Sequence, residues 1–270
     1  MPSGVAGVVL AAGEGTRLRP LTHLRPKALC PVGNRPLVDW ALDRLAPHAS
    51  RLAVNVHHGR EQMLAHLADR AAAGLHLSLE EPEALGTAGA LGALREWLAG
   101  DAVLLTNVDM WHPPGPDPLA LLTDGWDGER PRLLCVRGGG RSDFDGLLYV
   151  GSALLPWWSV RDLAAVPSGL YEVSWRALHE QGRLDLVVAA EAPVDCGTPA
   201  GYLRANLAAS GGRSVVGEGA VVEGRLERSV VWPGARVELG EVLVEAIRAD
   251  GLTLRPLAAP APTGGPTSRQ

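Results

Sequence analysis

Residues 5–17 read VAGVVLAAGEGTR. The first six are uniformly apolar, as in a strand buried on both faces, and the last five, from Gly13 to Arg17, have the composition of a glycine loop. Glycines let backbone N–H groups approach phosphate oxygens closely, and the adjacent Arg17 can hold a pyrophosphate. The loop is neither a Walker A loop nor a dinucleotide fingerprint, because Gly-Lys-Ser/Thr and G-x-G-x-x-G are both absent. By itself it is equally compatible with a tight surface turn.

Apolar runs and helical patterns alternate along the next two hundred residues. We expect one helix that begins near Pro36 and three further helices that cover residues 60–73, 87–98 and 199–210. The strands that we expect cover residues 5–10, 51–56, 75–79, 102–108, 147–150 and 186–190. This alternation predicts an α/β fold with a doubly wound, mostly parallel, Rossmann-like sheet. Ligands of such sheets bind beyond the carboxyl ends of the strands, where the glycine loop and Asp109 both lie.

The pattern changes after Val215. Apolar residues recur six apart, with glycines between them, at Val216 and Val222 and again at Val231, Val237 and Leu243. This spacing is typical of the hexapeptide turns of a left-handed β-helix, although a pair of antiparallel hairpins gives a similar spacing.

We therefore expect three regions in the chain. Residues 1–210 form the main domain, residues 213–257 a short C-terminal left-handed β-helix of about two coils, and residues 258–270, rich in Pro and Ala, a disordered tail. Because residues 213–257 hold no cluster of catalytic side chains, we expect them to serve packing or oligomerisation and to contribute nothing to chemistry. A homo-oligomer is one expected outcome.

Composition argues against several classes of function. The net charge of −5 provides no basic surface for nucleic acid. No run approaches the roughly 18 apolar residues of a membrane span, and the N-terminal residues lack a basic leader and a cleavage site, so we expect neither a membrane protein nor a signal peptide. The three cysteines, Cys30, Cys135 and Cys196, lie far apart without metal-ligand spacing. We expect them to be reduced thiols of a cytoplasmic protein.

One basic residue differs from all the others. Lysine and arginine together number 25, and Lys27 is the only lysine among them. A composition so rich in arginine supplies arginine wherever a positive charge is enough. A compact ammonium group is not interchangeable with a guanidinium where phosphate oxygens must be approached as a point charge. We therefore predict a functional role for Lys27.

Lys27 lies within a longer pattern, LRPLT at residues 18–22 followed by RPKALCPVGNRPL at residues 25–37. Residues 8–37 closely resemble the signature of the sugar-1-phosphate nucleotidyltransferases, the family of mannose-1-phosphate guanylyltransferases, glucose-1-phosphate thymidylyltransferases and the muramate uridylyltransferase. Three further segments resemble other motifs of the family and occur in the same order. They are LGTAGAL at residues 85–91, NVD at 107–109 and VDCGTP at 194–199, and Tyr202 and Asn206 follow the last of them. The resemblance covers about residues 5–210.

The resemblance implies transfer of a nucleoside monophosphate from a nucleoside triphosphate to a sugar 1-phosphate, with release of pyrophosphate. Such chemistry needs positioning and charge neutralisation more than covalent catalysis. By the same resemblance, Asp109 and Asp195 hold Mg²⁺, Arg17 receives the leaving pyrophosphate, and Lys27 bridges phosphates near the reacting centre. The nucleotide-binding residues that the resemblance implies are Leu10, Ala11, Ala12, Gly13, Gly15, Thr16, Gly86 and Thr87.

Two features depart from the family pattern. Val108 replaces the small glycine usual before the metal aspartate, so we expect its side chain to lie close to the ligand. The Glu-Lys-Pro segment whose lysine holds the sugar phosphate in the family has no counterpart here, since Lys27 is the only lysine. We expect Arg137 or Arg141 to substitute for it, with Gly146 also in the sugar-phosphate site.

These departures keep a second function open, that of a nucleotide-sugar-binding regulatory protein of the same fold with weak or absent turnover. Retention of the two aspartates, Arg17 and Lys27 favours the enzyme, whereas loss of the second lysine favours the binding protein. An acyltransferase built on the β-helix is disfavoured, because two coils are short for an acyl-donor groove and residues 213–257 contain no histidine.

Overall fold

A seven-stranded sheet forms the centre of the computed structural model, which describes residues 4–138 and 142–256. Its strands, in spatial order, are β10 (Asp185–Val188), β8 (Arg132–Arg137), β9 (Leu147–Leu155), β6 (Ala102–Asn107), β1 (Val5–Leu10), β4 (Arg51–Val56) and β5 (His76–Leu79). All neighbouring pairs are parallel except the two that β9 makes, with β6 and with β8. The expected mostly parallel sheet is confirmed, and β9 is an antiparallel strand within it.

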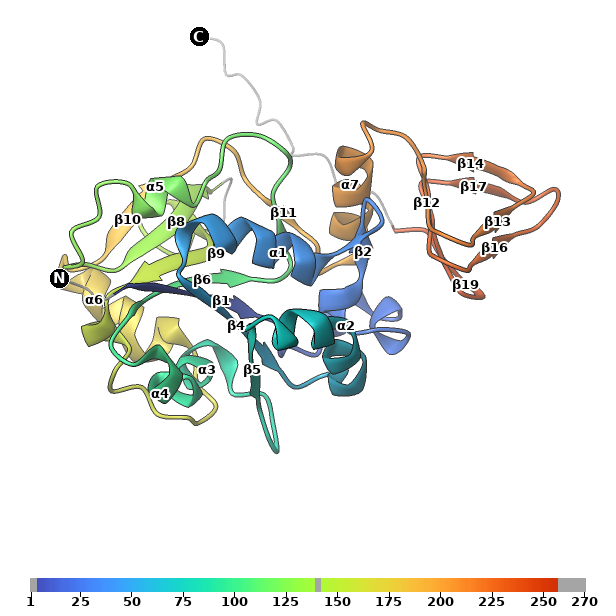
Figure 1. The fold of residues 1–270 in the computed structure, drawn as a ribbon. Helices are drawn as coiled ribbons and strands as arrows, with labels where there is room; N and C mark the ends of the chain where they lie inside the picture. The colour runs from blue at the N-terminus through green and yellow to red at the C-terminus, as the bar shows by residue number, and fades with distance from the viewer. Residues whose placement is uncertain (1–3, 139–141, 257–270) are drawn as a thin grey trace, which may run out of the picture.

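Helices cover both faces of this sheet (Figure 1). Successive strand residues point to opposite faces, so Val9 and Leu104 join one buried cluster while Val8 and Leu105 join the other. The first cluster also contains residues of α1 (Leu37–Leu45), α2 (Arg60–Ala72) and α7 (Pro199–Ala209), and the segment leading into α5 (Ala120–Thr123). The second contains residues of α3 (Gly86–Ala93), α4 (Arg95–Leu98) and α6 (Arg176–Glu180). The main domain is therefore a three-layer, doubly wound α/β structure.

The largest differences from the expected boundaries concern two elements. The helix expected over residues 87–98 is divided at Leu94 into α3 and α4. Glycines of α3 lie directly against another backbone segment, and a Cβ at Gly92 would collide with Ala164. The strand expected to end at residue 150 continues through Gly151 to Leu155, because the apolar run resumes after that glycine.

Short elements connect the main ones. Four are short strands, β2 (Pro31–Val32), β3 (Arg35–Pro36), β7 (Met110–Trp111) and β11 (Val194–Asp195). Six are short turns of 3-10 or π type, at residues 16–18, 21–23, 27–29, 46–48, 157–159 and 171–175. β2 pairs with β3 and β7 with β11, both antiparallel. The second pairing connects the segments that carry Asp109 and Asp195.

Residues 215–254 form a coil of short strands beside α7, at one end of the molecule (Figure 1). The strands are β12 (Val215–Val216), β13 (Val221–Val222), β14 (Arg225–Glu227), β15 (Val230–Val231), β16 (Arg236–Val237), β17 (Val242–Val244), β18 (Ile247–Ala249) and β19 (Leu252–Leu254). β12, β15 and β18 pair in parallel order, as do β13 with β16 and β14 with β17.

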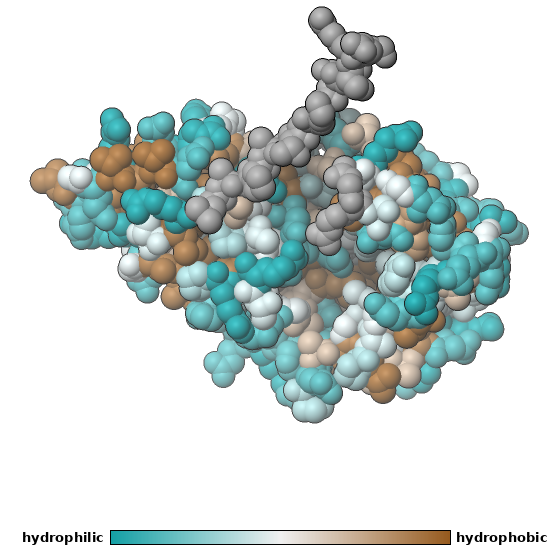
Figure 2. Space-filling view, turned by 180° about the vertical axis from the view of Figure 1, so that it is seen from behind, coloured by the Kyte–Doolittle hydropathy of each residue, from teal (hydrophilic) through white to brown (hydrophobic). Residues whose placement is uncertain are grey.

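The interior of the coil is continuous with the core of the main domain. Val231, Val237 and Leu243, which the six-residue spacing selected, are at most 1% exposed. Val216 does not follow this spacing, since 41% of it is exposed. Figure 2 shows the coil, on the left, with apolar patches among its polar surface.

The expected disordered tail, residues 258–270, lies outside the described residues. Of the described helices, none is long and apolar enough to cross a membrane.

Candidate active site

A pocket of about 230 Å³ opens at the carboxyl ends of β1, β4 and β6. It is lined by Leu10, Ala12, Gly13, Lys27, Asn55, Ala84, Gly86, Thr87, Asn107 and Asp109. Five of the expected nucleotide-binding residues are among them. Ala11 lies behind the wall, and Gly15 and Thr16 belong to the same loop but do not line the pocket. The strand-end position predicted for the glycine loop and Asp109 is confirmed.

Lys27 and Asp109 form the central ion pair of this pocket. Lys27 Nζ donates to Asp109 Oδ2 over 2.7 Å, and their side chains are only 15% and 9% exposed. Lys27 begins a short 3-10 turn that follows Pro26, and Asp109 comes just after the end of β6. Charge-assisted hydrogen bonds of this kind are strong, and removing one partner leaves a buried charge without compensation.

Asp195 and Arg17 form a second, more exposed pair beside the first. Arg17 Nη1 lies 3.4 Å from Asp195 Oδ2, with side-chain exposures of 64% and 38%. The antiparallel pairing of β7 with β11 and a hydrogen bond of 2.9 Å from Cys196 N to Asp109 O bring Asp195 next to Asp109. The backbone N–H of Gly197 donates to Asp195 Oδ1 over 2.7 Å and orients that carboxylate.

The space between these charged groups exists because residue 197 is glycine. A Cβ at Gly197 would lie 2.8 Å from Asp195 Oδ1, 3.2 Å from Asp109 Oδ2 and 2.7 Å from Arg17 Nη2. Both carboxylates therefore border one small space that a methyl group would fill. Paired carboxylate oxygens around such a space suit a hard divalent cation.

A buried polar network missed by the sequence analysis connects the two loops of the pocket. Asn55 Oδ1 accepts from Ala11 N over 2.6 Å, and Asn55 Nδ2 donates to Glu80 Oε1 over 2.7 Å. Glu80 Oε2 accepts from Leu85 N over 2.7 Å, although Glu80 is only 2% exposed. The network ties the glycine loop to the loop before α3. Asn55 lies one residue before the end of an expected strand, so the strand-end rule was an available signal for it.

Two of the expected nucleotide-binding residues, Gly86 and Thr87, contact a neighbouring backbone segment. Gly86 has a φ of +69°, and a Cβ there would lie 2.6 Å from the carbonyl oxygen of Ser168. The hydroxyl of Thr87 accepts from Leu170 N over 2.9 Å. Both contacts join α3 to residues 168–170, so these two residues shape the wall of the pocket.

The expectation that Val108 lies close to the ligand is wrong. Val108 is 3% exposed and packs in the core on the α1 side of the sheet, near Trp40 and Ala41. Adjacent residues of an extended segment point to opposite sides, so Asn107 and Asp109 line the pocket while Val108 does not.

The residues expected to hold the sugar phosphate are described in part. Arg137 is the last residue of β8, which runs parallel to β6, so it lies at the pocket edge of the sheet with an exposed side chain. Gly146, with a φ of +80° and open space around its Cβ position, precedes β9 at the same edge. Arg141 lies outside the described residues.

The three cysteines are buried free thiols, in agreement with the expectation. Burial raises the pKa of Cys30 and of Cys135 to about 12, so both thiols stay protonated at neutral pH. A protonated thiol is a poor nucleophile.

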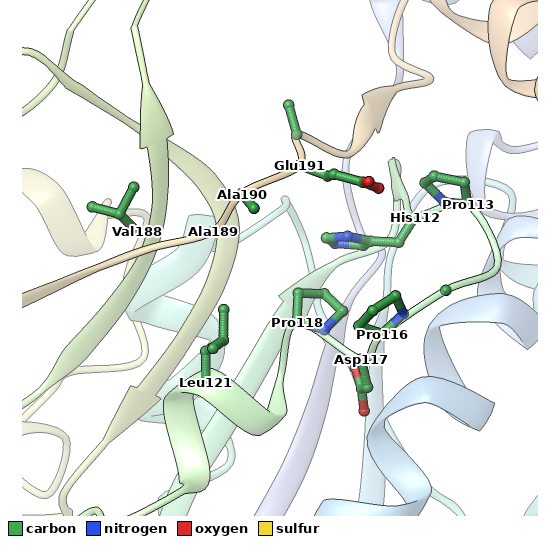
Figure 3. A pocket seen from close by; sticks show the side chains of 12 residues that line it. His112, Pro113, Pro116, Asp117, Pro118, Leu121, Val188, Ala189, Ala190 and Glu191 are labelled. Atoms are coloured by element: carbon green, nitrogen blue, oxygen red, sulfur yellow. The ribbon is translucent and has the colours of Figure 1, made fainter.

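A second cavity, of about 350 Å³, lies between the segment after β7 and the segment before β11 (Figure 3). Prolines and alanines dominate its wall, and the charged residues among its described lining are Asp117 and Glu191. Although larger than the strand-end pocket, it offers no Lys or Arg among those lining residues to meet phosphates. Burial, assisted by Arg44, lowers the pKa of His112 in this wall to about 4.

Several known proteins are similar to this chain. The N-acetylmuramate alpha-1-phosphate uridylyltransferase of Caulobacter vibrioides is 40% identical over 129 residues, which cover 46% of this chain and 53% of that protein. The UTP–glucose-1-phosphate uridylyltransferase of Synechocystis sp. is 30% identical over 118 residues, 36% of this chain and 30% of that protein. The matches thus span about half or less of the length of these relatives.

A crystal structure of a candidate glucose-1-phosphate thymidylyltransferase from Bacillus anthracis has a similar fold. It superimposes with a TM-score of 0.59 at 18% identity, covering 76% of this chain and 95% of that one. The likeness confirms the α/β architecture of the main domain. Residues 7–213 match the model of the MobA-like NTP transferase domain, which is well over half of the chain, and the chain therefore belongs to the MobA-like NTP transferase domain family.

Proposed function

We propose that this chain transfers a nucleoside monophosphate from a nucleoside triphosphate to a sugar 1-phosphate. An oxygen of the sugar phosphate attacks the α-phosphorus, the bond from that phosphorus to the bridging oxygen of the β-phosphate breaks, and pyrophosphate leaves with that oxygen. The observation that carries the proposal is the convergence of Lys27, Arg17, Asp109 and Asp195 beside Gly197. Phosphoryl chemistry depends on such preorganised charge more than on covalent catalysis.

Mg²⁺ fits the two aspartates. Asp109 Oδ2 and Asp195 Oδ1 border the space beside Gly197, and Mg²⁺ prefers carboxylate oxygens while retaining waters and binding substrate phosphates. Among the described residues no group of three or more His, Cys, Asp or Glu side chains could hold a metal, so of these residue types the two aspartates are the ligands proposed. When bound, Mg²⁺ neutralises phosphate charge and orients phosphate oxygens.

Lys27 and Arg17 would supply the cationic contacts of the protein itself. An ammonium group has three donors, so Lys27 can keep its bond to Asp109 and still donate to a phosphate oxygen. Arg17, at the exposed mouth, can clasp the leaving pyrophosphate with two parallel N–H groups. Gly13 lines the pocket with open space at its Cβ position, which lets phosphate oxygens approach the backbone of the loop.

The sugar phosphate needs a further cation, since two anionic substrates repel each other in a partly desolvated pocket. We assign this contact to Arg137, with Gly146 beside it; Arg141 is the other expected residue. Support for Arg137 comes from its place at the end of β8, on the same edge of the sheet as Asn107.

The Caulobacter relative makes UTP with N-acetylmuramate 1-phosphate the first substrate pair to test, followed by mannose 1-phosphate and glucose 1-phosphate with each nucleoside triphosphate. The assay is pyrophosphate release in the presence of Mg²⁺, with Asp109→Asn as the matched control. Turnover of one pair that disappears without Mg²⁺ and in the control supports the proposal.

The alternative, a nucleotide-sugar-binding regulatory protein, is favoured by the lack of a second lysine. Binding of a nucleotide sugar by calorimetry, with no turnover of any substrate pair, would select this alternative and refute the enzyme. A protein that shows neither binding nor turnover would refute both functions.

We also propose that residues 213–257 form a short left-handed β-helix. The parallel pairing of each strand from β12 to β15 with the third strand after it, and the six-residue spacing of Val231, Val237 and Leu243, support this assignment. A crystal structure would test its handedness.

A further inference from the structure

One tryptophan of the coil contacts the segment that carries Lys27. Trp232 follows β15 and is 2% exposed, although it belongs to a part of the chain without catalytic side chains. The guanidinium carbon of Arg25 lies 4.5 Å from the centre of its ring, in cation–π geometry. Arg25 precedes Lys27 by two residues, so the face of the indole contacts the start of residues 25–31, which we call the Lys27 segment.

The edge of the same indole holds the end of that segment. Trp232 Nε1 donates to Tyr202 Oη over 2.9 Å, and Tyr202 in turn donates to the carbonyl oxygen of Pro31. Tyr202 is fully buried, and burial raises its pKa well above the usual value, so the phenol keeps the proton that it donates. Pro31 follows Lys27 by four residues.

Neighbouring contacts hold the same segment against α7 and the coil. Asn206 Oδ1 accepts from Gly33 N over 3.0 Å, and its Nδ2 lies 3.3 Å from the Pro31 carbonyl oxygen. Asn34 Nδ2 donates to the carbonyl oxygen of Val216 over 2.8 Å. Trp232 stands out because it contacts Arg25 directly and is linked to Pro31 through Tyr202, at the two ends of residues 25–31.

We propose that Trp232 is a positioning residue for catalysis: by holding Arg25 and, through Tyr202, Pro31, it keeps Lys27 Nζ in place beside Asp109. The coil thereby contributes to the chemistry of the main domain, contrary to the expectation from its sequence. Displacement of a catalytic group by about 1 Å costs roughly a hundredfold in rate, so a loosened Lys27 segment is costly. The inference rests on the role proposed above for Lys27.

The test compares the rates of three variants, each measured at a temperature where the variant is folded. Trp232→Leu removes both contacts, Trp232→Phe retains an aromatic face for Arg25 but loses the N–H donor, and Ile247→Ala damages the coil interior as a control. Ile247 is fully buried, and it pairs with Val230 of β15 without taking part in the contacts of Trp232 with Arg25 and Tyr202. We expect kcat to fall about tenfold or more in Trp232→Leu and less in Trp232→Phe. Ile247→Ala should lower Tm yet keep kcat within about twofold.

Two further measurements separate positioning from general damage. Hydrogen exchange of the backbone amides of residues 27–33 should accelerate in Trp232→Leu and not in Ile247→Ala. In a Lys27→Arg background, where most of the rate is already lost, Trp232→Leu should add less than about twofold, because both changes act through one side chain.

Unchanged exchange at residues 27–33, or a rate loss that is equal in the control or fully additive with Lys27→Arg, would overturn the inference. If Trp232→Leu does not fold, Trp232→Phe and Tyr202→Phe, which removes the hydroxyl bound to Pro31, carry the test. Hydrogen exchange needs no turnover, so an inactive wild-type protein would refute the proposed function while the structural contact remains testable.

Discussion

Replacing Gly197 by alanine adds a single methyl group to the space between the two aspartates. Ordinary van der Waals contact begins at 3.4 Å, whereas the new Cβ would lie 2.8 Å from Asp195 Oδ1. One of the two must shift by about 0.6 Å. Asp195 cannot shift freely, because the same oxygen accepts the N–H of Gly197.

A shift of this size in a carboxylate that is proposed to bind the metal should reduce kcat/KM about a hundredfold, or about 2.7 kcal/mol of transition-state stabilisation. Stability should change little, since Gly197 does not have a positive φ and alanine can adopt its backbone conformation. The assay is the initial rate of pyrophosphate release across a Mg²⁺ titration, together with Tm.

Gly251→Ala is the matched control, because its Cβ would meet nothing within 4 Å. We expect wild-type rates for this control and a weaker apparent Mg²⁺ affinity for Gly197→Ala. A Gly197→Ala protein with a rate within threefold of wild type and an unchanged Mg²⁺ dependence would refute the assignment of this space to the metal.

Three other changes test the remaining assignments. Lys27→Arg should lose most of the turnover with the fold intact, because a guanidinium cannot replace a compact ammonium 2.7 Å from Asp109; near wild-type turnover would show that charge alone suffices. Arg137→Ala should raise the KM for the sugar phosphate much more than that for the triphosphate, and equal effects on both would exclude Arg137 from that contact. Burial lowers the pKa of His112 from 6.5 to about 4. Between these pH values the unfolded chain binds a proton that the folded chain does not bind, so the free energy of unfolding falls by about 3 kcal/mol on acidification. Urea titrations of His112→Gln should show a correspondingly smaller loss between pH 7 and pH 4, and parallel losses would contradict the shifted pKa.

The sequence was enough to predict many of the short segments of the chain that form strands, helices and loops. The apolar run at residues 5–10, the glycine loop after it and the alternation of strands with helices predicted the layers of the fold and the edge of the sheet where the pocket opens. Lys27 was singled out from composition alone, and it lies in the pocket in contact with Asp109, while its functional role stays a prediction. The predictions of the layers and of the pocket position succeeded because the spacing of apolar residues and the position of a strand end are properties of short segments.

Other features needed the assembled chain. Val108 was misjudged from a family pattern, although the alternation of side chains along an extended segment was enough to turn it toward the core. The Asn55–Glu80 network, the antiparallel β9 and the approach of Asp195 to Asp109 join segments distant in sequence, and no local pattern states which segments meet. The contact of Trp232 with Arg25 is the clearest case, since the two residues lie more than two hundred positions apart in the chain. The sequence alone determined which residues could do chemistry, and only tertiary packing decided which of them are held together.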